Sequence, residues 1–118
     1  MSRSTPLRRT AIVVEDDTIQ RDMIALLLEE SDFQVIQCED AETASLALKA
    51  RHPSLLITDI KLTGKMSGIE LAHFARMMDP ALRVVVISGE PPASPLPEGV
   101  EYFSKPVYPV TLVRETTH

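Results

Sequence analysis

The stretch Ala11–Asp17, AIVVEDD, joins four apolar residues directly to three acidic ones. A short apolar run of this kind is typical of a strand that is covered on both faces, as in a parallel sheet. Glu15, Asp16 and Asp17 repel one another at the end of such a strand, unless water screens their charges or a cation neutralises them. A cation site at this position requires further ligands from other parts of the chain.

The composition is that of one globular domain. The chain has 118 residues, of which 44% are hydrophobic and 25% charged, so it is long enough to bury a core. Its net charge of -5 argues against a nucleic-acid partner. The single cysteine, Cys38, excludes a disulfide framework, and no apolar run approaches the roughly 18 residues of a membrane span. Residues 1–10 lack the apolar core of a signal peptide. We therefore expect a soluble, cytoplasmic protein with no membrane partner.

Short apolar blocks alternate with longer segments of helical spacing. The predicted strands are Ala11–Val14, Phe33–Gln37, Leu55–Thr58, Arg83–Ile87 and Glu101–Phe103. The predicted helices are Thr18–Glu30, Ala41–Ala50, Gly68–Met78 and a short last one near Val110–Glu115. This alternation predicts an α/β fold with a doubly wound, five-stranded parallel sheet. We assign residues 1–9 to an N-terminal tail and residues 10–118 to a single domain.

The helices carry apolar patterns and capping residues. In the first helix the residues Ile19, Met23, Leu26 and Leu27 recur every three or four positions. In the second, the predicted buried side consists of Ala44, Leu46, Ala47 and Leu48. Asp17 or Thr18 can cap the first helix and Asp40 the second.

The segment between Ser88 and Lys105 interrupts the alternation. Four prolines fall within seven of its residues: Pro91, Pro92, Pro95 and Pro97. A proline in a helix interior costs roughly 3 kcal/mol, so an ordinary helix cannot form there. We predict an extended or single-turn loop for this crossover.

Reactive side chains follow four of the predicted strands. Glu15 and Asp16 follow the first strand, Asp59 the third, Ser88 the fourth and Lys105 the fifth. In a parallel doubly wound sheet these strand ends form the ligand-binding edge. Carboxylate oxygens are the ligands that Mg²⁺ prefers, and a carboxylate beside the metal can become an acyl phosphate. The hydroxyl and the ammonium would then bind phosphoryl oxygens.

Five motifs, in this order, resemble those of the receiver domains of two-component response regulators, and the chain is similar to the chemotaxis-type single-domain regulators. They are VVEDD (13–17), LLITDIKL (55–62), SGIELA (67–72), VVVISGE (84–90) and YFSKP (102–106). The resemblance runs from about Thr10 to the C-terminus. It implies a flavodoxin-like strand order, 2-1-3-4-5, with the fourth helix of the family reduced or missing here because of the prolines.

The resemblance also implies the roles of individual residues. Asp59 would accept a phosphoryl group from a phosphohistidine, carried by a sensor histidine kinase or a histidine phosphotransfer protein. Mg²⁺ would be held by Asp16 and Asp59, by Glu15 mainly through a water, and by the backbone carbonyl of Lys61. The expected activity is self-phosphorylation and self-dephosphorylation only, and the output is a contact with a downstream protein target, made by a monomer or weak dimer.

Three further residues match the switching part of the family pattern. Ser88 would be the switch hydroxyl, Tyr102 the aromatic rotamer switch, and Lys105 the partner of the acceptor carboxylate or its phosphoryl group. The bond from Lys105 to Pro106 is often cis in the family. We also hypothesise that Lys61 and Glu90, with opposite charges, meet across the mouth of the site and slow dephosphorylation.

Two other functions remain open at this stage. One is a pseudo-receiver, an interaction module that is not phosphorylated. The other is a phosphatase of the haloacid-dehalogenase type, which also uses an aspartate nucleophile and Mg²⁺. That class needs a second aspartate two residues after the nucleophile, where this chain has Lys61. A stand-alone regulator and a receiver from a larger protein would look the same in this sequence.

Overall fold

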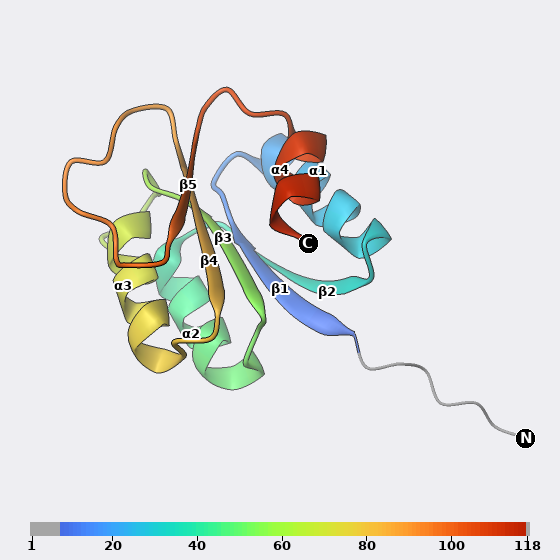
Figure 1. The fold of residues 1–118 in the computed structure, drawn as a ribbon, viewed down its shortest axis with the longest axis horizontal. Coiled ribbons are helices and arrows are strands. Elements are labelled where there is room, and N and C mark those ends of the chain that lie inside the picture. Colours follow the sequence, from blue (N-terminus) through green and yellow to red (C-terminus); the bar gives the residue numbers. More distant parts are fainter. Residues whose placement is uncertain (1–7, 118) are drawn as a thin grey trace, which may run out of the picture.

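The computed structural model describes residues 8–117, and its centre is a five-stranded parallel sheet. Residues 1–7, which make up most of the predicted tail, and His118 lie outside the described residues. The strand order is β2-β1-β3-β4-β5, as the resemblance implied (Figure 1). The strands are β1 (Arg9–Val14), β2 (Phe33–Cys38), β3 (Leu55–Asp59), β4 (Arg83–Ser88) and β5 (Glu101–Ser104). The predicted doubly wound α/β fold is therefore confirmed.

Four helices cover the two faces of the sheet: α1 (Thr18–Glu30), α2 (Ala41–Arg51), α3 (Gly68–Met78) and α4 (Pro109–Thr116). Helices α1 and α4 lie on one face, and α2 and α3 on the other (Figure 1). Successive strand residues point to opposite faces, so Ile12 and Val14 pack under α2 and α3 while Ala11 and Val13 pack under α1 and α4. Both faces of the central strands are therefore buried. None of the described helices is long and apolar enough to cross a membrane.

Side-chain caps fix the starts of three helices. The Asp17 carboxylate accepts hydrogen bonds from the N–H groups of Ile19 (3.0 Å) and Gln20 (3.2 Å) and so caps α1. The Asp40 carboxylate accepts one from Thr43 N–H (2.8 Å) and caps α2, as predicted. Helix α3 starts with a capping box between Ser67 and Glu70.

The apolar pattern of α1 does not mark its buried side. The residues that α1 buries are Ile24, Ala25 and Leu28, whereas Ile19, Met23 and Leu26 are exposed. Helix α1 carries two apolar stripes with helical spacing, and periodicity alone does not choose between them. In α2 the prediction that Leu46 is buried was wrong, because 65% of this residue is exposed. Ala44 and Leu48, one helical turn apart, face the core there.

The proline-rich crossover between β4 and β5 contains no helix, as predicted. Residues 89–100 form bends, a turn and irregular backbone, drawn as the orange loop beside α3 in Figure 1. Leu96 and Val100 pack against the core under α2 and α3. The ring of His73 on α3 lies 3.3 Å from the carbonyl oxygen of Pro95, measured from Nε2. The middle of the loop is thus attached to the domain by apolar side chains and by the contact with His73.

Helix α3 starts in direct contact with the end of β3. The N–H of Gly68 donates to the carbonyl oxygen of Ile60 (2.8 Å). A Cβ atom at position 68 would overlap the carbonyl oxygen of Asp59, so only glycine allows this approach. Glycine at position 68 therefore allows the start of α3 to lie against the backbone of Asp59.

Candidate functional site

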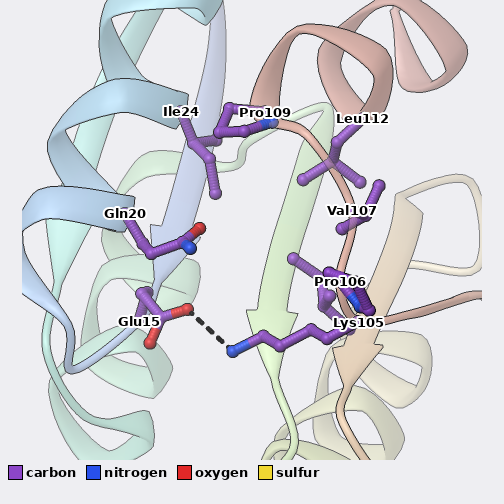
Figure 2. Close-up of a pocket in the computed structure, with 9 residues that line it drawn as sticks. Glu15, Gln20, Ile24, Lys105, Pro106, Val107, Pro109 and Leu112 are labelled. Carbon is purple, nitrogen blue, oxygen red and sulfur yellow. Dashed lines mark hydrogen bonds and ion pairs between the residues drawn. The ribbon is translucent and has the colours of Figure 1, made fainter.

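The carboxyl ends of the strands bring Lys105 to two carboxylates. Lys105 follows β5, and its Nζ donates to Asp59 Oδ2 (2.9 Å) and Glu15 Oε1 (3.4 Å); Figure 2 shows the contact with Glu15. Its backbone N–H donates to the carbonyl oxygen of Ser88 (2.7 Å), which ties the segment after β5 to β4. The peptide bond from Lys105 to Pro106 is cis, as the resemblance led us to expect.

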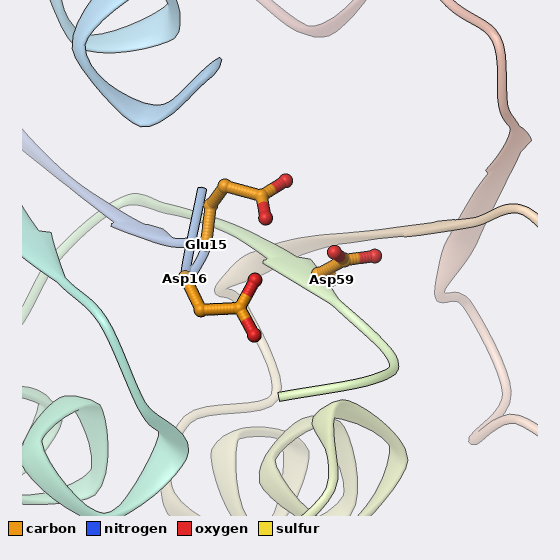
Figure 3. Close-up of side chains that lie close together, drawn as sticks. All are labelled: Glu15, Asp16 and Asp59. Carbon is orange, nitrogen blue, oxygen red and sulfur yellow. The ribbon is translucent and has the colours of Figure 1, made fainter. Parts of the chain in front are cut away.

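Three carboxylates gather beside this lysine. One oxygen from each of Glu15, Asp16 and Asp59 lies within 4.8 Å of the others (Figure 3). Glu15 and Asp59 are buried, while Asp16 is exposed. Hard oxygen ligands in this arrangement, with one open to solvent, fit a divalent cation such as Mg²⁺, which keeps several waters. The neighbouring Asp17 does not belong to the cluster, because its carboxylate caps α1.

Burial and the neighbouring groups shift the pKa values of Glu15 and Lys105, and both are raised. Burial raises the pKa of Glu15 to about 7; the negative charge of Asp59 adds to this, while the N–H of Asp17 and the charge of Lys105 oppose it. Burial acts to lower the pKa of Lys105, but its hydrogen bond to Asp59 and the charges of Asp59 and Glu15 outweigh that and raise it. The site therefore favours an ammonium on Lys105, and it retains a proton on Glu15 more readily than an exposed glutamate would.

The predicted switch residues both contact Glu90. Ser88 is the last residue of β4 and is buried, and its Oγ accepts a hydrogen bond from Glu90 N–H (3.1 Å). The strand register pairs Asp59 with Ile87, so Ser88 lies one residue beyond the position next to Asp59. Tyr102 on β5 donates its hydroxyl to the Glu90 carbonyl (3.3 Å), with 37% of the residue exposed. Ser88 and Tyr102 are thus linked through the backbone N–H and carbonyl of the same residue, Glu90.

The side chain of Lys61 forms an ion pair with Glu90. Its Nζ lies 2.5 Å from Glu90 Oε1, and both side chains are largely exposed. The hydrogen bond from Lys61 and its positive charge lower the pKa of Glu90. The pair joins the loop after β3 to the loop after β4, so the opposite charges noted in the sequence do meet.

A cavity of about 310 Å³ lies next to the Glu15–Lys105 ion pair (Figure 2). One wall is Gln20 and Ile24 of α1, and the opposite wall is formed by the segment after β5 and by α4. Sequence reasoning missed this cavity. It arises from the meeting of two elements that are far apart in the sequence, and no local motif marks such a meeting.

Comparison with known proteins defines the class. Residues 11–115 match the family model described as the response regulator receiver domain, so this chain belongs to the receiver domain family. It is 33% identical over 109 residues to the response regulator receiver protein CpdR of Brucella abortus, covering 88% of this chain and 90% of that protein. It is 32% identical over 114 residues to the phosphate regulon transcriptional regulatory protein PhoB of Escherichia coli. That match covers 91% of this chain but only 49% of PhoB, so the chain spans about half the length of that regulator.

Solved structures agree with this family. A response regulator receiver protein from Sinorhizobium medicae superposes with a TM-score of 0.84 at 22% identity, covering 96% of this chain and 94% of that one. The receiver domain of the hybrid histidine kinase CckA gives a TM-score of 0.77 at 27% identity, covering 92% of this chain and 99% of that domain. The chain is therefore a receiver domain of two-component signalling in both sequence and fold.

Proposed function

We propose that this receiver domain accepts a phosphoryl group from a phosphohistidine onto Asp59 in a Mg²⁺-dependent reaction and thereby switches its binding to a protein partner. One observation carries the proposal. Three carboxylate oxygens lie within 4.8 Å of one another, and the Lys105 ammonium lies 2.9 Å from Asp59. This arrangement supports roles for Asp59 as nucleophile, for the carboxylates as cation ligands and for Lys105 as a positive charge that binds phosphoryl oxygens.

The proposed metal ligands are Asp16, Asp59, the backbone carbonyl of Lys61 and, through a water, Glu15. When bound, Mg²⁺ supplies positive charge that reduces the repulsion between the carboxylates and attracts phosphoryl oxygens. Asp16 is the exposed member of the cluster, so solvent and an incoming phosphoryl group can reach the site from its side.

The proposed reaction transfers a phosphoryl group between two nucleophiles. An Asp59 carboxylate oxygen forms the new bond to phosphorus, the phosphorus–nitrogen bond of the donor breaks, and its electron pair returns to the imidazole nitrogen. Lys105 offers its ammonium to a phosphoryl oxygen, and the hydroxyl of Ser88 offers a second donor. Attack of water on the acyl phosphate later releases inorganic phosphate and restores the Asp59 carboxylate.

The contacts of Glu90 suggest how phosphorylation of Asp59 would change the protein surface. Ser88 Oγ now accepts the Glu90 N–H, and a move of this hydroxyl toward a phosphoryl oxygen would break that bond. The Tyr102 hydroxyl is bonded to the carbonyl of the same residue, so a shift of Glu90 would change the position of the tyrosine ring. We propose that a downstream protein reads this change.

The exposed apolar residues near the cavity support a protein donor, either a sensor histidine kinase or a histidine phosphotransfer protein. Ile19 and Met23 on α1 and Tyr108 and Val110 at the start of α4 are exposed although apolar. The cavity between these helices opens beside Lys105. These four residues lie on or next to the two helices that line the cavity, and a surface rich in exposed apolar side chains is typical of protein interfaces. We further propose that residues 10–118 act in the cytoplasm as a monomer or weak dimer.

Incubation with acetyl phosphate and Mg²⁺, followed by intact-protein mass spectrometry, tests the proposal. We expect the wild-type protein to gain one phosphoryl group, Asp59→Asn to gain none, and Asp22→Asn, an exposed aspartate of α1, to behave as wild type. A wild-type protein that stays unmodified would instead indicate a pseudo-receiver. Continuous turnover of phosphoesters would indicate a phosphatase.

A further inference from the structure

Glu42 joins the start of α2 to the loop between β3 and α3. Its Oε2 accepts hydrogen bonds from the backbone N–H groups of Lys65 (2.8 Å) and Met66 (3.1 Å). Close by, Asp40 pairs with Thr63 in an isolated parallel β-bridge. The N-terminus of α2 therefore contacts the middle of this loop at two points.

The loop backbone is shaped around the Glu42 carboxylate. Gly64 has a φ of +95°, a conformation that favours glycine, and a Cβ there would lie 2.8 Å from Glu42 Oε1. The hydrogen bond from Lys65 N–H, with those from Glu42 and Met66 N–H, lowers the pKa of Glu42 and keeps the carboxylate ionised. Oε1 is buried with no partner among the described residues, which costs free energy that an apolar side chain would avoid. The two hydrogen bonds accepted by Oε2 therefore explain why this position carries a carboxylate although Oε1 has no partner among the described residues.

This loop leads directly from Asp59 and carries Lys61. Its two ends are fixed by other contacts, because Gly68 N–H bonds to the Ile60 carbonyl and Ser67 caps α3. Between these ends the loop is held by the hydrogen bonds that Glu42 accepts and by the Asp40–Thr63 bridge. It is also held by the Lys61–Glu90 ion pair and by the packing of Ile60, Leu62 and Met66 against the core. Loss of the Glu42 contacts would release the backbone at Lys65 and Met66 and so weaken the support of the loop that carries Lys61.

We propose that Glu42 is a positioning residue: by helping to hold the loop 60–67 it steadies the backbone of Lys61, two residues after Asp59, and preorganises the site of Glu15, Asp16 and Asp59 for a divalent cation. The inference rests on the proposed function, since it assumes that Mg²⁺ binds at this cluster. Residues that orient metal ligands without touching the metal commonly change affinity about 10- to 100-fold when they are replaced.

Magnesium titration of the unphosphorylated protein, followed by backbone amide resonances, tests the inference without any activity assay. We expect Glu42→Ala to weaken Mg²⁺ binding about tenfold. The same spectra should show at least about tenfold faster hydrogen exchange at the Lys65 and Met66 amides, whose acceptor has been removed. Glu39→Ala removes the same charge from an exposed residue three positions earlier and should change the affinity less than about twofold.

Two further variants keep the test decisive. Glu42→Gln keeps an oxygen that can accept both N–H groups and should bind Mg²⁺ within about threefold of wild type. Should Glu42→Ala fail to fold, Glu42→Asp, which is shorter by one methylene, should show the same weakened binding and faster exchange.

The outcomes separate this inference from the proposed function. Wild-type protein that binds Mg²⁺ together with a Glu42→Ala variant of unchanged affinity would overturn the positioning role and leave the proposed function intact. Unchanged exchange at Lys65 and Met66 in that variant would overturn it as well. Wild-type protein that does not respond to Mg²⁺ would overturn both.

Discussion

Glu15 lies at the end of β1 with only 2% of its surface exposed, where an ionised carboxylate is costly. Among the described ion pairs, its carboxylate is paired with Lys105, which also contacts Asp59, so one ammonium faces two buried carboxylates. The metal-free site therefore holds an excess of negative charge. A bound divalent cation would remove this excess, which links the binding of metal to the stability of the fold.

The raised pKa of Glu15 predicts an unusual pH dependence of stability. Below about pH 4.5 the carboxyl is protonated in both the folded and the unfolded chain. Between about pH 4.5 and 7 the unfolded chain releases the proton while the folded protein retains it, so this group makes folding less favourable as the pH rises. Urea unfolding in the presence of a chelator should show this loss as a difference between wild type and Glu15→Gln. A constant difference between the two proteins across this pH range would contradict the prediction.

The ion pair between Lys61 and Glu90 gives a prediction for the phosphorylated state. The pair lies between the loops after β3 and β4, and we expect it to hinder the water that attacks the acyl phosphate. Replacing both residues with alanine should speed phosphate release by no more than about two- to fivefold, since an exposed ion pair is screened by solvent. The exposed pair Arg114 and Glu115 on α4, replaced in the same way, is the control. An unchanged half-life of the phosphorylated protein would rule out this role.

Residue types predicted the cluster but not the residue that holds the neighbouring loop. Glu15, Asp59 and Lys105 could be identified because each follows an apolar strand, and parallel strands end at the same edge. Glu42 could not, because its partners are backbone N–H groups 23 and 24 residues away. Every residue except proline has such a group, so the sequence carries no signal for the contact.

Among the elements, the crossover between β4 and β5 follows most directly from the sequence. Its prolines exclude a helix, and the structure has none there. The burial of α1 could not be predicted in the same way, since Ile24 and Leu28 on one side compete with Ile19 and Met23 on the other. Packing against the sheet decides between the two sides, and this is a tertiary effect.

Leu96 should anchor the proline-rich crossover. It is partly buried against the core under α2 and α3, and no helix of its own holds this loop. We expect Leu96→Ala to lower the free energy of unfolding by about 1 kcal/mol and to increase cleavage of residues 89–100 by added protease. Leu46→Ala, which truncates an exposed leucine of α2, should change stability by less than about 0.5 kcal/mol. Equal effects of the two substitutions would mean that Leu96 is not an anchor.

At the scale of the whole molecule, the alternation of segments predicted the layered fold, and the resemblance supplied the strand order. Alternation alone leaves the order open, because several arrangements satisfy right-handed crossovers. The cavity beside Lys105 and the shared contacts of Glu90 could not be predicted from the sequence. Each depends on side chains and backbone from elements distant in sequence.

The approach of Gly68 to Asp59 predicts a strict requirement for glycine. Gly68→Ala should destabilise the protein by about 3 kcal/mol, because the added methyl group meets backbone atoms that cannot rotate away. Gly89 is a matched control, since a Cβ there meets no atom within 4 Å, and Gly89→Ala should change stability by less than about 1 kcal/mol. Urea unfolding of both variants measures the difference. A Gly68→Ala protein as stable as wild type would show that α3 can shift away from β3.

That same close approach ties the start of α3 to the end of β3. The first turn of α3 lies directly against the carbonyl of Asp59, so we expect this helix and β3 to move together. Under the proposed function, we expect a change at Asp59 to be transmitted instead through the backbone of Glu90, which contacts Ser88 and Tyr102, to the edge strand β5. A partner that distinguishes the phosphorylated from the unphosphorylated protein should then contact Glu90 and β5.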